Sequence, residues 1–400
     1  MITETHDQRS PADLSSLTSF DFQSRTRLVF GINSIESAGE LAQSLPAKRI
    51  LLVTDAGIVA AGHATRVRTI LEANNLSVFL FDRVQENPTT RCIDHCVQVA
   101  KENQIDAIIG LGGGSSMDTA KGCNFLLTNG GEMKDYWGVG KATKPMLPLM
   151  AIPTTAGTGS ECQSAALIAD EITHQKMACL DPKAAARIAV LDPALTISQP
   201  ARVTACTGID AIAHAIETAV TKKRNAISMM YSCEAFKLMA ANFSAVLKNP
   251  RDLEARGKML LGAAFAGTAI ENSMLGAAHS AANPLTAHFG IAHGQAVGMM
   301  LPQIVRFNGE DPEARQIYAE LARVGEIASG LENQTGWLAL IEWLNSTLKI
   351  ADMPLSLAEC GVGRAEIPEL AREAAGQWTA GFNPRQVTET DFIEIYEAAF

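Results

Sequence analysis

The first half of the chain alternates strand-like and helix-like segments, and this alternation restricts the possible folds more than any other feature. Apolar runs typical of buried strands occupy 49–54, 78–81 and 105–111. Helix-like segments lie between them, one ending near residue 74 and another running from about 87 to 103. Because strands separated by helices pair in parallel, we expect a parallel sheet that is covered by helices.

The second half has a different pattern, in which helical periodicity replaces strand-like runs after about residue 195. Long Ala-, Leu- and Met-rich stretches with this periodicity lie at 208–220, 226–248, 252–270 and 313–329. Such a change indicates a domain boundary, and a length of 400 residues suits two domains. We therefore expect an α/β domain at 1–193, in which 1–24 form a ragged extension, and an all-helical domain at 194–400.

The composition of the chain limits which binding partners and which cellular compartment we expect. The net charge of −10 comes from 33 basic and 43 acidic residues. Such a chain lacks the basic footprint that nucleic acids and anionic membranes require, so we expect neither as the main partner. No run approaches about 18 apolar residues, and the polar start at 1–7 differs from a signal peptide. The eight cysteines form no C-x-x-C pair, so we expect free thiols in a cytoplasmic protein.

Four residues in the second half form a candidate metal site. Asp210 and His214 lie four positions apart in a helix-like stretch, so their side chains share one helix face. His279 and His293 add two imidazoles further along the chain. One carboxylate with neutral imidazoles suits a borderline divalent metal such as iron or zinc. A metal held in this way, with one coordination position open, acts as a Lewis acid.

A glycine-rich segment after the third strand is a candidate phosphate site. It reads GGGSSMDTAK at 112–121, between a strand and a helix. Glycines allow close approach of the backbone to a phosphate, and the helix N-terminus offers free N–H groups. A tight strand-to-helix turn is the alternative interpretation. The segment also differs from the usual G-x-G-x-x-G pattern, in which the acidic residue follows the glycines.

Two further segments of the first half carry groups that suit a dinucleotide. Asp55 lies at the carboxyl end of the first clear strand, where it can accept a ribose 2′-hydroxyl and repel a 2′-phosphate. This favours NAD over NADP, with a helix N-cap as the alternative role. The loop PTTAGTGSE at 153–161 is rich in hydroxyl donors and can hold a pyrophosphate or a nicotinamide amide. An ordinary capped turn is the alternative for this loop.

Taken together, these motifs resemble the iron-dependent (group III) alcohol dehydrogenase family. They occur in the family's order and with family-like separations, and the resemblance spans about residues 25–390. The matching segments are 112–121, 153–161, 192–193, 207–217 and 279–294.

The resemblance implies an N-terminal dinucleotide-binding α/β domain, a helical C-terminal domain and a cleft between them, as in dehydroquinate synthase. It implies Fe²⁺ or Zn²⁺ as the metal, NAD as the cofactor, a small alcohol or aldehyde as the substrate, and a homodimer. The implied metal ligands are Asp210, His214, His279 and His293. The implied cofactor contacts are Gly113, Gly114 and Ser115 at the pyrophosphate, Thr154, Thr155 and Thr158 along the cofactor, Asp55 at the ribose, and Asn87 and Lys176.

The chain departs from the family pattern four residues after the third implied ligand. Many members carry a histidine there, beside the nicotinamide and the substrate, but this chain has Asn283. An amide cannot relay a proton as imidazole does, so we assign no catalytic residue beyond the metal ligands. Ala165 also stands where some relatives have a polar residue.

The expected reaction is hydride transfer between NAD(H) and an alcohol or aldehyde. The alternatives are a hydroxyacid–oxoacid transhydrogenase, a glycerol dehydrogenase-like polyol oxidoreductase and a non-catalytic binding protein of the same fold. Retention of all four ligands argues against the metal-free maleylacetate reductases. Glu217, three residues after His214, is either a partner that orients an imidazole or a carboxylate on a solvent-facing helix surface.

Overall fold

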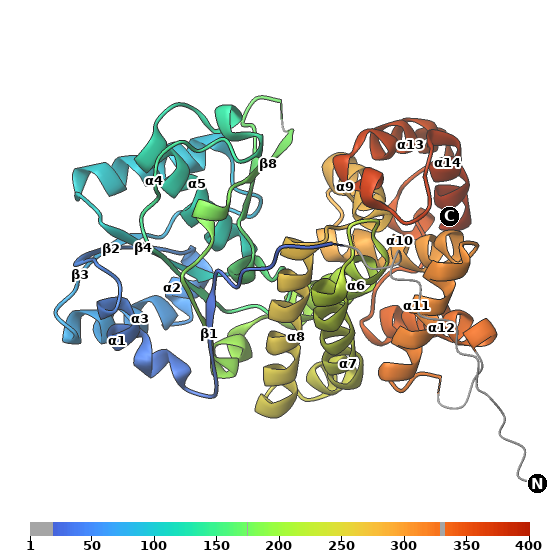
Figure 1. Ribbon diagram of the computed structural model, residues 1–400, viewed down its shortest axis with the longest axis horizontal. Coiled ribbons are helices and arrows are strands. Elements are labelled where there is room, and N and C mark those ends of the chain that lie inside the picture. The colour runs from blue at the N-terminus through green and yellow to red at the C-terminus, as the bar shows by residue number, and fades with distance from the viewer. Residues whose placement is uncertain (1–18, 174, 329–332) are drawn as a thin grey trace, which may run out of the picture.

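The computed structural model describes residues 19–173, 175–328 and 333–400, which form an α/β half and a helical half (Figure 1). Most of the expected ragged extension, residues 1–18, lies outside the described residues. Residues 19–25 have no regular secondary structure and lead into the first strand. No helix among the described residues is long and apolar enough to cross a membrane.

The α/β half is built on a six-stranded sheet in which every neighbouring pair of strands is parallel. The expectation of a parallel sheet is therefore confirmed. In spatial order the strands are β1 (Arg27–Phe30), β9 (Ile188–Leu191), β6 (Leu149–Pro153), β4 (Ala107–Gly112), β2 (Arg49–Val53) and β3 (Ser77–Phe81).

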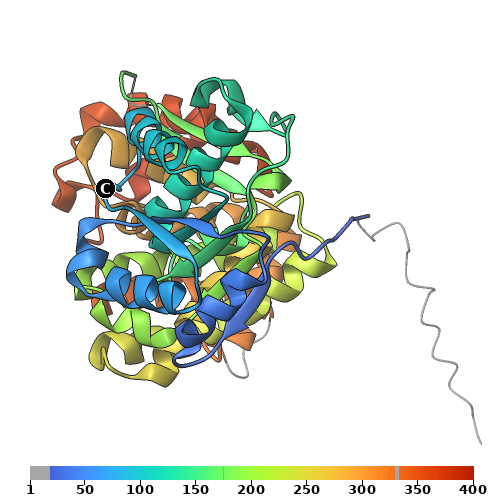
Figure 2. The same cartoon turned by 90° about the vertical axis from the view of Figure 1, so that its left-hand side faces the viewer.

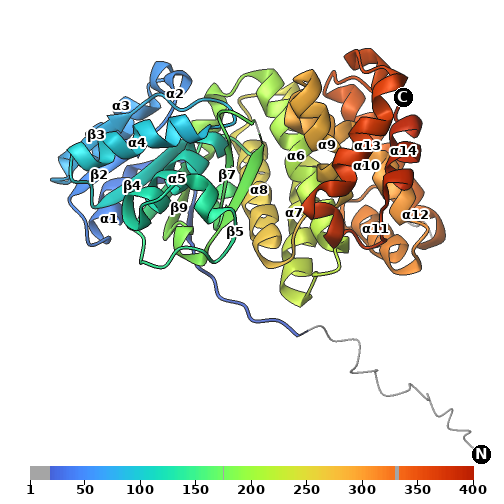
Figure 3. The same cartoon turned by 90° about the horizontal axis from the view of Figure 1, so that it is seen from above.

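Helices cover both faces of this sheet, because alternate strand residues point to opposite sides. Ile50 and Leu52 pack into the core beneath α1 and α3, whereas Leu51 and Val53 pack beneath α4 and α5. Figure 3 shows α4 and α5 side by side over the strands. The helices of this half are α1 (Ala38–Gln43), α2 (Ala56–Ala60), α3 (His63–Ala73), α4 (Thr90–Glu102) and α5 (Gly114–Asn129).

A second, three-stranded sheet packs beside α5, and the sequence did not predict it. Its strands are β5 (Gly138–Val139), β8 (Lys176–Leu180) and β7 (Ala165–Ala169), in that order. The β7–β8 pair is antiparallel, so the half is not purely parallel. These strands have short, mixed patterns of burial, which is why no clear strand signal stands out from the loops around them.

The helical half confirms the expectation for the second half of the chain. Figure 2, with the α/β half facing the viewer, places these helices behind the sheet. Helix α6 is buried around almost its whole circumference, so it runs through the core. The helices are α6 (Ala201–Val220), α7 (Ala226–Lys248), α8 (Leu253–Asn272), α9 (Ala277–Phe289), α10 (His293–Asn308), α11 (Pro312–Val324), α12 (Asn333–Ile350), α13 (Ile367–Gly376) and α14 (Glu389–Ala398).

Candidate functional site

The four predicted metal ligands come from three helices that meet in the core of the helical half. Asp210 and His214 lie on α6, His279 lies in the first turn of α9, and His293 is the first residue of α10. The start of α10 approaches α6 closely because the next residue is Gly294. A Cβ at that position would lie 2.0 Å from the Cys206 carbonyl oxygen, so only glycine allows this approach.

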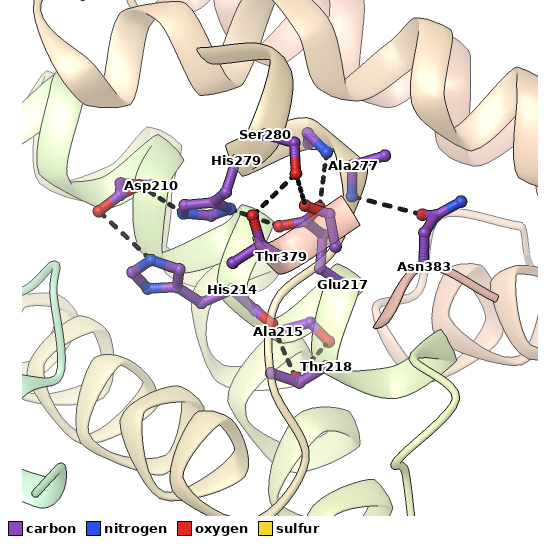
Figure 4. Close-up of polar contacts among 12 residues, drawn as sticks. Asp210, His214, Ala215, Glu217, Thr218, Ala277, His279, Ser280, Thr379 and Asn383 are labelled. Carbon is purple, nitrogen blue, oxygen red and sulfur yellow. Dashed lines mark hydrogen bonds and ion pairs between the residues drawn. The ribbon is translucent and has the colours of Figure 1, made fainter. Parts of the chain in front are cut away.

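The side chains of the three histidines surround the Asp210 carboxylate. Its Oδ1 lies 3.4 Å from His279 Nε2 and 3.8 Å from His293 Nε2, and its Oδ2 lies 3.5 Å from His214 Nε2. Figure 4 shows His214 and His279 reaching Asp210 from two directions. Asp210, His279 and His293 form the tightest group, with one ligand atom of each within 4.8 Å of the others.

This geometry fits a divalent cation. Ligand atoms that sit about 2.1 Å from a tetrahedral ion lie roughly 3.4 Å from one another, close to the distances seen around Asp210. Asp210 Oδ1 and His279 Nε2 are buried and have no hydrogen-bond partner, which is unusual for buried polar atoms. A bound metal ion would satisfy both. His293 keeps 30% of its side chain exposed, so the cluster opens to solvent on that side.

Glu217 contacts the His279 ring on the side opposite Asp210. It lies on α6, is 3% exposed, and contacts His279 Nδ1 through Oε2. Its Oε1 accepts a hydrogen bond from the Ala278 N–H at 2.7 Å, so one carboxylate fixes both the backbone and the ring of the third ligand (Figure 4). The interpretation of Glu217 as an imidazole partner is therefore confirmed, and the solvent-facing alternative is wrong.

The charges of the cluster follow from burial and from mutual attraction. Burial raises the pKa of Asp210, but the three histidines outweigh it and hold the pKa well below its usual range. Burial lowers the pKa of His279, but Glu217 and Asp210 prevail and raise the pKa to about 9. For His214 and His293 burial prevails, and it lowers the pKa of His293 to about 3. The cluster thus offers an anionic oxygen and two neutral imidazoles, the forms that bind a metal, whereas His279 holds a proton that a bound metal would displace.

The two predicted cofactor loops lie directly against each other at the carboxyl ends of β4 and β6. The Thr154 N–H donates to the Gly112 carbonyl at 2.9 Å. A Cβ at Gly114 would lie 2.7 Å from Thr158 Cγ2, and one at Gly113 would lie 3.4 Å from the Thr155 side chain. Helix α5 starts in this cradle without a side-chain cap, so its first N–H groups, including that of Ser115, are available to an anion.

The remaining predicted cofactor residues are Asp55, which faces the glycine loop, and the pair Asn87 and Lys176, which contact each other. Asp55 lies two residues after the end of β2, and its Oδ1 caps α2 by accepting from the Ile58 N–H at 3.0 Å. Its Oδ2 faces the glycine loop, 3.5 Å from where a Cβ of Gly112 would stand. Asp55 thus has the N-cap role and still presents an oxygen to the cradle. On β8, Lys176 donates to Asn87 Oδ1 at 3.4 Å, and it lies near enough to His293 to help lower the pKa of that imidazole.

Two charged residues near the site, Lys121 and the partly buried Glu271, have no role assigned from the sequence. Lys121 of α5 is fully buried, and Nζ donates to the Ser160 carbonyl at 2.6 Å, beneath the threonine-rich loop. Glu271 of α8 accepts from the Ser164 N–H at 2.9 Å and from the Ser164 hydroxyl at 2.6 Å. Lys121 stands within the glycine-rich motif, which was its only sequence signal. Glu271 had none, because its partner is 107 residues away.

Asn283 follows His279 by one turn of α9 and lies on the same helix face. Its Nδ2 donates to Gln377 Oε1 at 3.1 Å. A pair of amides therefore stands where an imidazole was expected from the family pattern, and neither amide can carry a proton.

Comparisons with known proteins agree with this geometry. Residues 25–193 match the family "Iron-containing alcohol dehydrogenase", and residues 204–400 match "Fe-containing alcohol dehydrogenase family, C-terminal". This chain belongs to the iron-containing alcohol dehydrogenase family. As a member it is an oxidoreductase, and its Asp210 cluster is the place for the divalent metal.

Several relatives align with nearly the whole length of this chain. Alcohol dehydrogenase 4 of Schizosaccharomyces pombe is 34% identical over 373 residues, which cover 93% of this chain and 87% of the relative. The NAD-dependent methanol dehydrogenase of Bacillus methanolicus is 34% identical over 372 residues, with 93% and 97% covered. The crystal structure of a 1,3-propanediol oxidoreductase superposes with a TM-score of 0.92 at 30% identity, covering 96% of this chain and 100% of that structure.

Proposed function

We propose that this alcohol dehydrogenase family member transfers a hydride between NAD(H) and a small alcohol or aldehyde. The observation that carries the proposal is the convergence of three helices on Asp210, with His214, His279 and His293 around it. Relatives named as NAD-dependent methanol dehydrogenase and 1,3-propanediol dehydrogenase support both the cofactor and the substrate class.

In this proposal some residues bind the metal or the cofactor, and others orient the residues that bind them. A divalent metal supplies a Lewis acid that polarises the substrate oxygen, and the nicotinamide exchanges the hydride. Asp210 and the imidazoles hold the metal, and Glu217 fixes the His279 ring by its contact with Nδ1. We propose that Gly113, Gly114 and Ser115 bind the pyrophosphate, while Thr154, Thr155 and Thr158 line the cofactor. Asn87 and Lys176 add contacts at the rim.

The preference for NAD rests on Asp55. Its free Oδ2 suits a ribose 2′-hydroxyl and repels a 2′-phosphate, and a solved relative, a sulfoacetaldehyde reductase of Bifidobacterium kashiwanohense, is a complex with NAD⁺. We further propose Fe²⁺ as the metal, because the family name specifies iron and the nitrogen–oxygen ligand set accepts it. A cytoplasmic homodimer with domains at 1–193 and 194–400 completes the proposal.

The test is elemental analysis of the purified protein, combined with NADH and NADPH oxidation across short aldehydes. We expect one divalent metal per chain and faster turnover with NADH. Turnover that exchanges a hydroxy acid for an oxo acid without added NAD would favour the transhydrogenase alternative. Bound metal with no turnover on any aldehyde or alcohol would contradict the proposed reaction.

The variant Asp55→Ser tests the cofactor preference separately. Serine keeps an N-cap oxygen for α2 but removes the negative charge, so the fold of the loop is retained. We expect the ratio of kcat/KM for NADH over NADPH to fall by about ten-fold, which corresponds to ~1.4 kcal/mol. An unchanged ratio would show that Asp55 does not distinguish a ribose 2′-hydroxyl from a 2′-phosphate.

A further inference from the structure

The segment 154–164, which we call the bridging loop, contacts both halves of the molecule. It follows β6 and leads into β7. On the cofactor side, Thr154 bonds to Gly112 and Thr158 packs on Gly114, as described above. The same loop then turns toward the helices that carry the metal ligands. It therefore connects the candidate cofactor site with the helices around the candidate metal site.

Lys121 fixes the bridging loop from the side of the α/β half. Besides the bond to the Ser160 carbonyl, its Nζ donates to Ser160 Oγ at 2.8 Å and to the Ala165 carbonyl at 3.0 Å. The Ser160 hydroxyl in turn donates to Asp118 Oδ1 at 3.1 Å. Because Lys121 and Asp118 lie on α5, whose N-terminus is the glycine cradle, one helix contacts both cofactor loops.

Backbone contacts bring the bridging loop against the helical half. A Cβ at Gly157 would lie 2.5 Å from Thr207 Cβ on α6, three residues before Asp210. A Cβ at Gly267 on α8 would lie 2.2 Å from the Gly159 carbonyl oxygen. Both contacts are close because no side chain stands between the segments, but van der Waals contact alone does not fix a register.

Glu271 supplies two hydrogen bonds at this junction. It lies in the last turn of α8, where the helix dipole disfavours a carboxylate, so its position is not explained by the helix itself. Both of its oxygens accept hydrogen bonds from a single residue of the bridging loop, Ser164, which is 5% exposed. Arg25 adds a longer contact of 3.4 Å to Oε1.

We propose that Glu271 is a positioning residue that holds the bridging loop, and with it the cofactor, at a fixed distance from the metal ligands. This inference rests on the proposed function for its catalytic consequence. Hydride transfer requires reacting atoms in a narrow range of separation, and a displacement of about 1 Å can lower the rate by about 100-fold. Among the described residues, Glu271 has no hydrogen bond or ion pair with a predicted ligand or a cradle residue, so its contact with the bridging loop is through Ser164.

The experiment compares Glu271→Ala, Glu271→Gln and the control Glu254→Ala in the metal-loaded protein. Glu254 lies on the same helix, is exposed, and pairs with Lys258 instead of the loop. For Glu271→Ala we expect kcat to fall about 10- to 100-fold. We expect metal content and the Kd of NADH, measured by fluorescence, to stay within two-fold. Glutamine retains one acceptor for Ser164, so Glu271→Gln should recover part of kcat.

Two further measurements separate positioning from general loss of structure. A deuterated alcohol should show a larger isotope effect on kcat in Glu271→Ala, because hydride transfer becomes more rate-limiting. Hydrogen exchange should accelerate at the amides of 157–164 in Glu271→Ala and not in Glu254→Ala, and this readout needs no turnover.

The outcomes distinguish this inference from the proposed function. A wild-type protein without NAD-linked turnover would overturn the proposed function, and exchange at 157–164 would still decide whether Glu271 fixes the loop. Unchanged kcat and unchanged exchange in Glu271→Ala would overturn the positioning role. A parallel loss of metal, NADH binding and kcat, with no recovery in Glu271→Gln, would also overturn it, since Glu271 would then be needed only for folding.

Discussion

The substitution Glu217→Gln gives a quantitative test of the metal site. In the parent chain both carboxylate oxygens of Glu217 are used, Oε2 by the His279 ring and Oε1 by the Ala278 N–H. Glutamine keeps the shape but has only one acceptor oxygen. In either orientation of the amide, one of the two donors therefore faces an NH₂ group and loses its hydrogen bond.

The size of the effect follows from the burial of this contact. His279 and Glu217 have side chains that are 6% and 4% exposed, so solvent cannot replace the lost bond. Removal of a carboxylate that orients a metal-bound imidazole lowers metal affinity by about 10- to 100-fold. This corresponds to about 1.4–2.7 kcal/mol in the free energy of metal binding. We expect the loss to be at the upper end, because the backbone at the start of α9 is released as well.

The assay is a competition titration against a chelator of known affinity, with Fe²⁺ under anaerobic conditions and with Zn²⁺. Glu373→Gln is the matched control, since Glu373 pairs with His288 at 2.9 Å on the surface and not at the site. We expect the control to bind metal as the parent does. Equal metal affinity in Glu217→Gln and the parent would refute the argument that Glu217 orients a ligand.

Three further outcomes are expected. In His279→Ala, metal content and turnover should be lost while circular dichroism remains that of the parent, since α9 is otherwise intact. In Gly114→Ala, the added methyl would lie 2.7 Å from Thr158, and the Kd of NADH should rise roughly 10-fold with metal content unchanged. Burial raises the pKa of Glu161 from 4.5 to about 7, so the folded state binds its proton more tightly than the unfolded state and stability falls as pH rises through this range. Urea unfolding should therefore find Glu161→Gln more stable than the parent above pH 7, on the order of 2–3 kcal/mol, with this advantage absent near pH 4.5.

The fold was predictable where the pattern was strong and local. Continuous apolar runs predicted β2, β3 and β4, and long periodic stretches predicted α6, α7 and α8. The single helix expected up to about residue 74 is instead two helices, because Gly62 adopts a φ of 82° between α2 and α3. Such a break leaves little trace in hydrophobic periodicity. The strands β7 and β8 pair with each other across a short connection, and they were missed because their patterns of burial are short and mixed.

The candidate site was predictable as a set of residues but not as a network. Motif order led to Asp210 and the three histidines, which the structure brings together. Spacing alone could not decide whether Glu217 faces a histidine or solvent, because that depends on where α9 packs. The partners of Glu271 lie more than 100 residues away in the sequence, and no local sequence pattern predicts such a contact.

Close backbone contacts fix the position of the cofactor loop relative to the metal cluster. Gly294 places the start of α10 on α6, Gly157 places the bridging loop on α6, and Gly267 places it on α8. Helix α6 carries two of the predicted ligands and also contacts the bridging loop at Gly157, so it is common to both candidate sites. Helix α8 contacts the loop at Gly159 and Ser164 but carries none of the predicted ligands. Substitutions on α8 should therefore disturb hydride transfer according to their distance from Gly159 and Ser164, and not according to their distance from the metal.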